Sequence, residues 1–225
     1  MTSFGLKLVA CITMLIDHLG LAIFNNNIFM RGIGRIAMPI FAFQVGVGFR
    51  HTHSKLKYIF RMLLCGIISE IPFLLLLSSS GFIPSLIPEN ITYFSLNICF
   101  TFAVALTSLY FLEKGKETPI FYIVSIFIVL LSIVIPMDYG IFAVLLVILS
   151  YFAKDKKIIL TLGTILIAIA YFLIRNNALQ LYMLLALPFI LLYNNQKGKS
   201  LKYYFYAFYP LHMLLIALVK IYLLK

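Results

Sequence analysis

Long apolar runs separated by short polar segments dominate this chain. Most of the runs approach the about 20 residues that a helix needs to cross the hydrocarbon core of a membrane. The pattern therefore predicts an all-α fold, a polytopic membrane bundle of about nine transmembrane helices. The expected spans are 6–24, 33–50, 58–79, 93–112, 119–136, 139–153, 158–174, 178–194 and 203–223.

Composition excludes a water-soluble globular fold. The 225 residues are 63% apolar and 11% charged, with a mean hydropathy of +1.07, whereas soluble domains are about 45–50% apolar and about 25% charged. The first run is too long for a signal peptide and lacks a cleavage site, so we expect it to be retained as a span. No repeat or long linker divides the chain, and residues 1–225 are predicted to form a single domain.

The net charge of +11 comes from 18 Lys and Arg residues against 7 Asp and Glu residues. Their distribution predicts a cytoplasmic N-terminus, because that orientation places most of these cations in cytoplasmic loops, as the positive-inside rule requires. In a soluble protein such an excess would indicate nucleic acid. Here we expect no nucleic-acid partner, because anionic lipid and a site for an anionic ligand account for the charge. The three cysteines lie in apolar runs and are predicted to be core residues.

Ionisable residues in the expected spans are concentrated in the first third of the chain. Each costs at least about 2.5–3.5 kcal/mol at the centre of a span and so needs a partner, a polar cavity or a function. Asp17 and His18 are adjacent in the first span, Arg35 lies in the second and Glu70 in the third. Lys7 precedes His18 by eleven residues, which places both on one helix face. The structural alternative is that His18 only bonds a neighbouring helix and that Arg35 snorkels.

Two prolines accompany these charges. Pro39 follows Arg35 and is predicted to kink the second helix, because its ring clashes with the carbonyl four residues earlier. Pro72 follows Glu70 and is predicted to break the third helix.

A cluster of cations and imidazoles follows the second span on the expected cytoplasmic side. Arg and Lys donors near a helix N-terminus suit phosphate oxygens, although an ordinary positive-inside loop is the alternative. No metal is expected, since no carboxylate or thiolate near the two histidines completes a site. We call these residues the 50–61 cluster: Arg50, His51, His53, Lys55, Lys57, Tyr58 and Arg61.

Polar residues also occur later in the chain. Asn97 lies in the fourth span, Asp138 is expected in a tight outer turn, and Tyr209 and His212 fall in the last span. Each on its own is typical of a structural residue. Together they would line a polar interior, in which His212 could orient or replace His18.

Several blocks of this sequence resemble the TraX family of bacterial integral membrane proteins, and the similarity spans nearly the whole chain. The blocks are Met14-Leu-Ile-Asp17-His18, Gly34-Arg35-Ile-Ala-Met-Pro39-Ile-Phe, Gly48-Phe-Arg50-His51-Thr52 with Lys57-Tyr58 and Arg61, Ser69-Glu70-Ile-Pro72-Phe, Asp138-Tyr-Gly140 and Tyr209-Pro210-Leu-His212.

The resemblance implies an activity. The family's name-giving member is associated with acetylation of a pilin N-terminus, and the family is grouped with transmembrane acyltransferases that include acyltransferase family three and the heparan-α-glucosaminide acetyltransferases. Those relatives carry a basic residue, ten intervening positions and a histidine in their first helix, as Lys7 and His18 do. This implies a multi-pass acetyltransferase of the bacterial cytoplasmic membrane. It would move an acyl group from cytoplasmic acetyl-CoA to an amine or hydroxyl of an extracytoplasmic peptide or carbohydrate.

Residue roles follow from that expectation. His18 would be the general base, with Asp17 or Glu70 supporting it, and Arg35 would stabilise the thioester oxyanion or pair with Asp17. The 50–61 cluster would bind the phosphates of coenzyme A. One alternative is a proton-coupled membrane transporter that uses Asp17, Glu70 and His18 as a relay. Another is a noncatalytic assembly partner in an envelope complex, in which the polar groups only fix packing.

Overall fold

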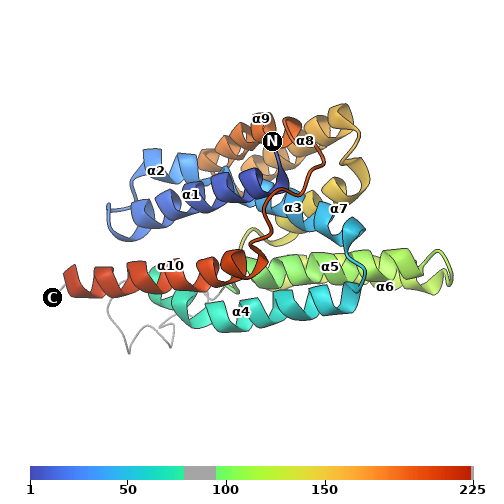
Figure 1. Cartoon of the computed structure of the whole chain (residues 1–225), viewed down its shortest axis with the longest axis horizontal. Helices are drawn as coiled ribbons and strands as arrows, with labels where there is room; N and C mark the ends of the chain where they lie inside the picture. Colours follow the sequence, from blue (N-terminus) through green and yellow to red (C-terminus); the bar gives the residue numbers. More distant parts are fainter. Residues whose placement is uncertain (79–94, 224–225) are drawn as a thin grey trace. The chain divides into compact units, whose positions relative to one another are not determined.

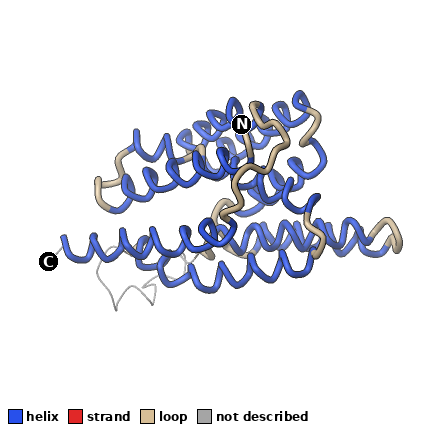
Figure 2. The backbone as a smooth tube through the Cα atoms, in the orientation of Figure 1, coloured by secondary structure: helices blue, strands red, loops and turns tan. Residues whose placement is uncertain are grey.

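A computed structural model describes residues 1–78 and 95–223, and within these ranges the fold is helical. The one β-type pairing in these ranges is an isolated bridge between Leu96 and Met137. Loops and turns join the helices, as Figure 2 shows. The expected span ends at 79 and 93 lie outside the described residues. The helices are α1 (Ser3–Ala22), α2 (Ile28–Gly34), α3 (Ala37–His51), α4 (Lys55–Leu77), α5 (Ile98–Lys114), α6 (Ile120–Val134), α7 (Gly140–Ala153), α8 (Lys157–Arg175), the 3₁₀ helix η3 (Ala178–Ala186), α9 (Leu187–Leu191) and α10 (Lys202–Leu223).

The chain is a multi-pass membrane protein. Helices coincide with all nine expected runs, but only five in the described residues are both long and apolar enough to cross a membrane. Several of the remaining runs form shorter apolar helices, so the expected count of nine spans is not confirmed. The five candidates are Ser3–Ala22, Ile28–His51, Lys55–Leu77, Lys157–Arg175 and Tyr203–Leu223.

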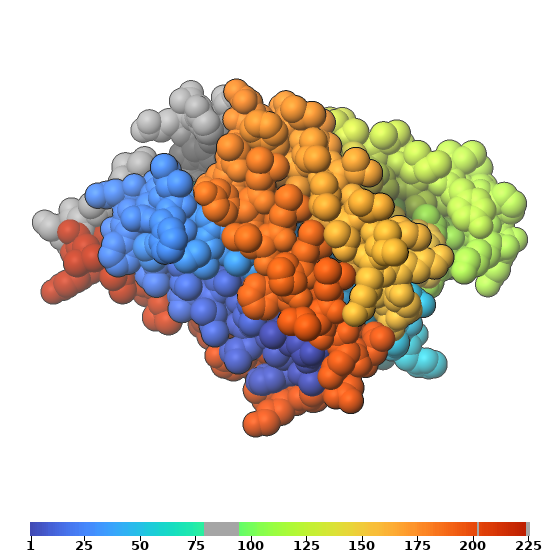
Figure 3. Space-filling model, turned by 90° about the horizontal axis from the view of Figure 1, so that it is seen from above, coloured from blue at the N-terminus to red at the C-terminus, as the bar shows by residue number. Residues whose placement is uncertain are grey.

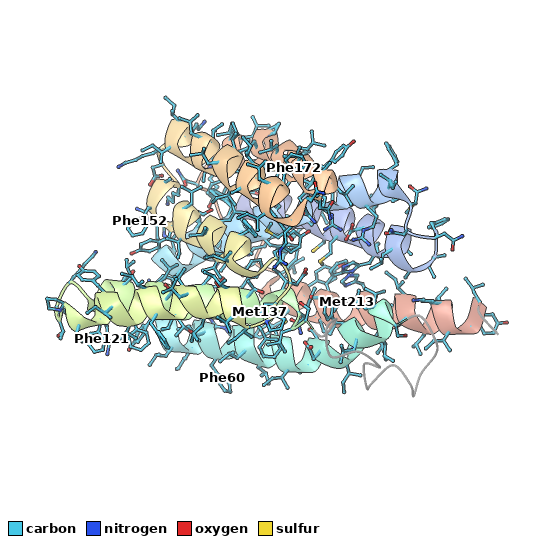
Figure 4. All side chains as sticks on the ribbon, turned by 180° about the vertical axis from the view of Figure 1, so that it is seen from behind. Phe60, Phe121, Met137, Phe152, Phe172 and Met213 are labelled. Atoms are coloured by element: carbon cyan, nitrogen blue, oxygen red, sulfur yellow. The ribbon has the colours of Figure 1, made fainter. Side chains whose placement is uncertain are left out.

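Large apolar side chains cover the outer faces of these helices. On α4, Phe60, Ile67 and Ile71 recur at helical spacing and are more than half exposed, and Figure 4 shows Phe60 at the outer side of its helix. Leu166 on α8 is 67% exposed. Such continuous apolar surface is typical of contact with lipid, so the structure supports the predicted association with a bilayer.

The helices form two compact units that interleave along the chain. Unit 1 contains Met1–Phe41, Ile67–Phe94 and Phe172–Lys225, and unit 2 contains Ala42–Gly66 and Ser95–Tyr171. The chain passes from one unit to the other within α3, α4 and α8. The expectation of a single domain over residues 1–225 stays a prediction.

In unit 1, α1 and α2 pack side by side, as Figure 1 shows. Two asparagines in left-handed conformation, Asn25 and Asn26, reverse the chain between them. Gly34 makes the approach close: a Cβ atom added there would lie 2.1 Å from Cβ of Asp17. The helices α2 and η3 also pack together, and their blue and orange surfaces adjoin in Figure 3.

Gly34→Ala is expected to destabilise unit 1, because the added methyl group overlaps the start of the Asp17 side chain and must push α2 from α1. Overpacking of this kind costs about 1–3 kcal/mol. Gly32→Ala is the matched control, since its Cβ would meet the Tyr182 ring at an ordinary 3.5 Å. Thermal unfolding in detergent should show a lower midpoint for Gly34→Ala alone. Equal midpoints for the two variants would contradict the packing argument.

The structure corrects both predictions about prolines. The backbone bends at residues 35–36, before α3 begins, and Pro39 therefore lies in the first turn of a helix, where its missing N–H is not needed. The predicted kink within a helix is thus a break between two helices. Pro72 does not end its helix either, because α4 continues to Leu77.

Unit 2 packs α5 against both α6 and α7. A pair of buried serines joins the first two of these helices: the hydroxyl groups of Ser108 and Ser125 lie 2.9 Å apart. On the unit 2 part of α3, Gly46 lies so close to α7 that an added Cβ would be 2.5 Å from the Val147 carbonyl oxygen.

Candidate functional site

Two histidines meet inside unit 1. Nδ1 of His18, on α1, lies 2.7 Å from Nε2 of His212, on α10. The rings are nearly parallel, at 4°, with centroids 4.9 Å apart. Since the facing nitrogens are much closer than the centroids, the rings meet edge to edge through this hydrogen bond. His212 is only 5% exposed, and His18 is half-buried.

Helix α10 holds His212 from its own preceding turn. Nδ1 of His212 lies 2.7 Å from the carbonyl oxygen of Phe208. The Phe208 ring also lies parallel to the imidazole, with centroids 4.7 Å apart, and Tyr209 lies on another side at 6.0 Å. The orientation of His212 is therefore fixed by main-chain and aromatic contacts together.

The residue before His18 belongs to a separate ionic network. Oδ1 of Asp17 accepts from Nη2 of Arg35 at 2.8 Å and lies 3.0 Å from Nε of Arg31. Arg31 also donates to Asn26, at 3.1 Å. All three charged side chains are largely buried, with exposed fractions of 6% for Arg35, 14% for Asp17 and 17% for Arg31. Two cations thus share one carboxylate.

This geometry decides between the roles predicted for the first-span residues. Arg35 pairs with Asp17, which is one of the two alternatives predicted for it; its role toward an oxyanion stays a prediction. Asp17 was also expected to support His18, but its carboxylate is held by the arginines, and Nδ1 of His18 faces His212 instead. Adjacent residues on a helix point about 100° apart, which separates the two functions. The predicted ability of His212 to orient His18 agrees with these contacts.

The other site residues of unit 1 lie on helices. Lys7, on α1, places its ammonium group 5.5 Å from the centroid of the Phe205 ring on α10. Glu70 lies on α4, directly after the fully buried Ser69, and its supporting role stays a prediction.

The 50–61 cluster belongs to unit 2, whereas Asp17, His18, Arg35 and Glu70 belong to unit 1. Two of its cations lie close to acidic groups from later helices. Arg50 lies 3.4 Å from Asp155, and Lys55 lies 3.7 Å from Glu113. These contacts are ion pairs between neighbouring helices of unit 2. The candidate site around His18 consists of unit 1 residues alone.

Other members of the cluster have different surroundings. His51 lies 2.9 Å from the ammonium group of Lys154, while His53 and Lys57 are exposed. Arg61 lies on α4, more than one turn after the helix begins, with its guanidinium 5.8 Å from the Tyr58 ring centroid. In the described ranges, no group of three or more His, Cys, Asp or Glu residues is arranged to hold a metal ion.

Asn97 and Asp138 have structural roles in unit 2. Asn97 is fully buried and caps α5 through the backbone N–H of Cys99, while its amide donates to the Gly66 carbonyl at 2.8 Å. Asp138 lies in a tight turn, where its carbonyl accepts from Thr101 at 2.8 Å. The predicted turn is confirmed. All three cysteines are buried and none forms a disulfide, as expected for core residues.

Two members of the unit 1 site were not found from the sequence. Arg31 was assigned to a loop, although its spacing of four from Arg35 places both on one helix face and could have revealed it. The Phe208 carbonyl gave no signal, because every residue supplies such a group.

The fold and the site together define a multi-pass, all-helical membrane protein with a polar centre between α1, α2 and α10. Residues 4–220 match the TraX protein family, and the chain belongs to it. The predicted family is thereby confirmed. Its wider resemblance to transmembrane acyltransferases finds no support in these comparisons.

Two relatives have been compared with this chain. A probable fimbrial assembly protein FimC, serogroup H1, of Dichelobacter nodosus is 28% identical over 99% of this chain and 97% of its own length. An uncharacterized protein of Rickettsia prowazekii (strain Madrid E) is 44% identical over 66 residues, which are 29% of this chain and 25% of that protein. No solved structure matches.

These comparisons correct the predicted function. We expected a membrane acyltransferase that uses acyl-CoA, with a proton-coupled transporter as the alternative. The relative that aligns over nearly its whole length is instead described as a fimbrial assembly protein, and neither description names acyl transfer or transport. Neither the acyltransferase function nor the transporter function is therefore retained.

Proposed function

We propose that this chain is a membrane component of fimbrial assembly, embedded in the bacterial cytoplasmic membrane with its N-terminus in the cytoplasm. The observation that carries the proposal is the alignment with the Dichelobacter fimbrial assembly protein across 99% of one chain and 97% of the other. A match over one segment would support only a shared motif. A match from end to end supports a shared role, and the proposed partner is accordingly a fimbrial subunit, a peptide and not a carbohydrate.

The His18–His212 pair is proposed as the functional site for this role. Small and apolar residues are sufficient for packing between membrane helices. The helices around His18 instead carry two imidazoles close to three largely buried charges. Ionisable groups within a membrane segment are costly and usually functional. The neighbouring Asp17 network supplies stability to the α1–α2 pair on which His18 is carried.

The tyrosines of α10 support a position for this pair near the middle of the bilayer. Tyr203 and Tyr222 are 80% and 78% exposed at opposite ends of the helix, as expected for aromatic residues at the two membrane interfaces. They are separated by roughly 28 Å along a helix that rises 1.5 Å per residue, close to the hydrocarbon thickness of ~30 Å. His212 lies about halfway between them.

Two further predictions are not carried into this proposal. That the chain is a CoA-dependent enzyme and that acetyl-CoA is its donor substrate stay predictions. The proposal requires only that His18 act within fimbrial assembly.

Removing the gene from its own bacterium is expected to abolish surface fimbriae, because the chain is proposed to act in their assembly. A plasmid copy of the wild-type chain should restore them. Fimbriae are counted by electron microscopy, and the cellular amount of fimbrial subunit is measured in parallel by immunoblot. Normal fimbriae in the deletion strain would overturn the proposal, and so would loss of fimbriae that the plasmid copy does not reverse.

A further inference from the structure

The contacts of His18 and His212 form a line of hydrogen bonds that begins at a main-chain carbonyl. The Phe208 carbonyl oxygen faces Nδ1 of His212, and Nε2 of His212 faces Nδ1 of His18, each across 2.7 Å. At these distances one atom of each pair must carry the proton and the other must accept it.

The first bond fixes the second. A carbonyl oxygen can only accept, so Nδ1 of His212 carries a proton. A neutral His212 then has a lone pair on Nε2, and the proton between the two rings must belong to Nδ1 of His18.

Burial favours a neutral His212. Its side chain has only 5% of its surface exposed, and an unpaired cation at such a site is strongly disfavoured. The carboxylate of Asp17, which precedes His18 in the chain, is held by Arg31 and Arg35 and not by the histidine pair.

We propose that His212 is a positioning residue that fixes the tautomer of His18, with the proton on Nδ1 and a lone pair on Nε2. His18 is thereby held as a neutral base or nucleophile whose Nε2 points away from His212. In a catalytic triad a carboxylate orients the histidine. Here a second histidine, itself hydrogen-bonded to a main-chain carbonyl, has that role. The inference deepens the proposed function, since it rests on His18 as the working residue.

The test measures the protonation of His18 directly. The chain has four histidines, so the side-chain nitrogen signals of ¹⁵N-histidine-labelled protein in nanodiscs can be assigned from single substitutions. In the wild type we expect nearly all His18 to be protonated on Nδ1 and unprotonated on Nε2. A His18 protonated mainly on Nε2, or on both nitrogens at pH 7, would overturn the inference.

Two substitutions of His212 test whether this residue sets the tautomer of His18. His212→Ala removes the acceptor, so the Nδ1-protonated form of His18 should fall to a minor fraction. His212→Gln is the conservative variant: its amide oxygen can accept from His18 while its amide N–H donates to Phe208, and the wild-type tautomer should be retained. His53→Ala, at an exposed position, is the control and should leave His18 unchanged. An unchanged His18 tautomer in folded His212→Ala would also overturn the inference.

This measurement is independent of fimbriae. If the deletion strain keeps its fimbriae while wild-type His18 is protonated on Nδ1, the proposed function fails and the tautomer assignment stands. If fimbriae depend on the chain but His18 carries its proton on Nε2, the proposed function stands and the role of His212 fails.

Discussion

Replacing His18 with alanine is expected to reduce surface fimbriae to the level of the deletion strain while the protein stays folded in the membrane. The substitution removes the proposed working imidazole. It also leaves Nε2 of His212 without its hydrogen-bond partner, which costs about 1–3 kcal/mol. That cost alone should lower the amount of protein only modestly. Fimbriae counted by electron microscopy in the complemented deletion strain, normalised to the amount of membrane-inserted protein, measure the effect.

The control for this variant is Glu117→Ala, which changes an exposed residue of unit 2 outside every predicted site and should support normal fimbriae. His18→Gln keeps hydrogen-bonding capacity but no titratable nitrogen, and it should fail as His18→Ala does. Normal fimbriae in strains that carry either His18 variant at wild-type amounts would show that the imidazole has no functional role.

Asp17→Asn is expected to give the largest loss of stability. The amide would remove the carboxylate that pairs with the largely buried Arg31 and Arg35 and would direct N–H groups toward them. Breaking a buried ion pair from one side costs about 3–5 kcal/mol, mostly because of the uncompensated charge that remains. The midpoint of thermal unfolding in detergent should fall sharply, and less folded protein should be recovered from membranes.

A matched control exists in unit 2. Asp155 pairs with Arg50 at 3.4 Å, but its side chain is 53% exposed. Asp155→Asn should therefore change the free energy of unfolding by only about 0–1 kcal/mol. Adding Arg35→Gln to Asp17→Asn removes one uncompensated cation and should recover part of the lost stability. Equal unfolding midpoints for Asp17→Asn and Asp155→Asn would contradict the burial argument.

The helical membrane fold was predictable from the chain because bilayer solubility is a local property. Runs such as 6–24 and 158–174 are apolar over a full span, and backbone groups in lipid must be satisfied within a helix. The residues at which helices end were less predictable. The local rule for Pro72 predicted an ending, but α4 continues past it to Leu77, because packing outweighs one lost backbone hydrogen bond.

The candidate site was predictable in its members more than in its pairings. Asp17, His18 and Arg35 were all identified, because charge in an apolar run is costly wherever it occurs. The partner of His18 was less certain, since 194 residues separate it from His212. Nothing in the sequence indicated that Glu113 and Asp155 from later helices pair with two cations of the 50–61 cluster; phosphate binding by this cluster stays a prediction.

The sequence by itself determined the membrane class, the helical fold, the family and most of the ionisable residues of the candidate site, since all of these follow from composition, local periodicity and motif. Only the tertiary structure decided which atoms meet. It assigned Asp17 to two arginines and His18 to a histidine near the opposite end of the chain. The physical reason is that a hydrogen bond depends on the direction and depth of two side chains. Helix packing sets both, and spacing along one chain does not specify them.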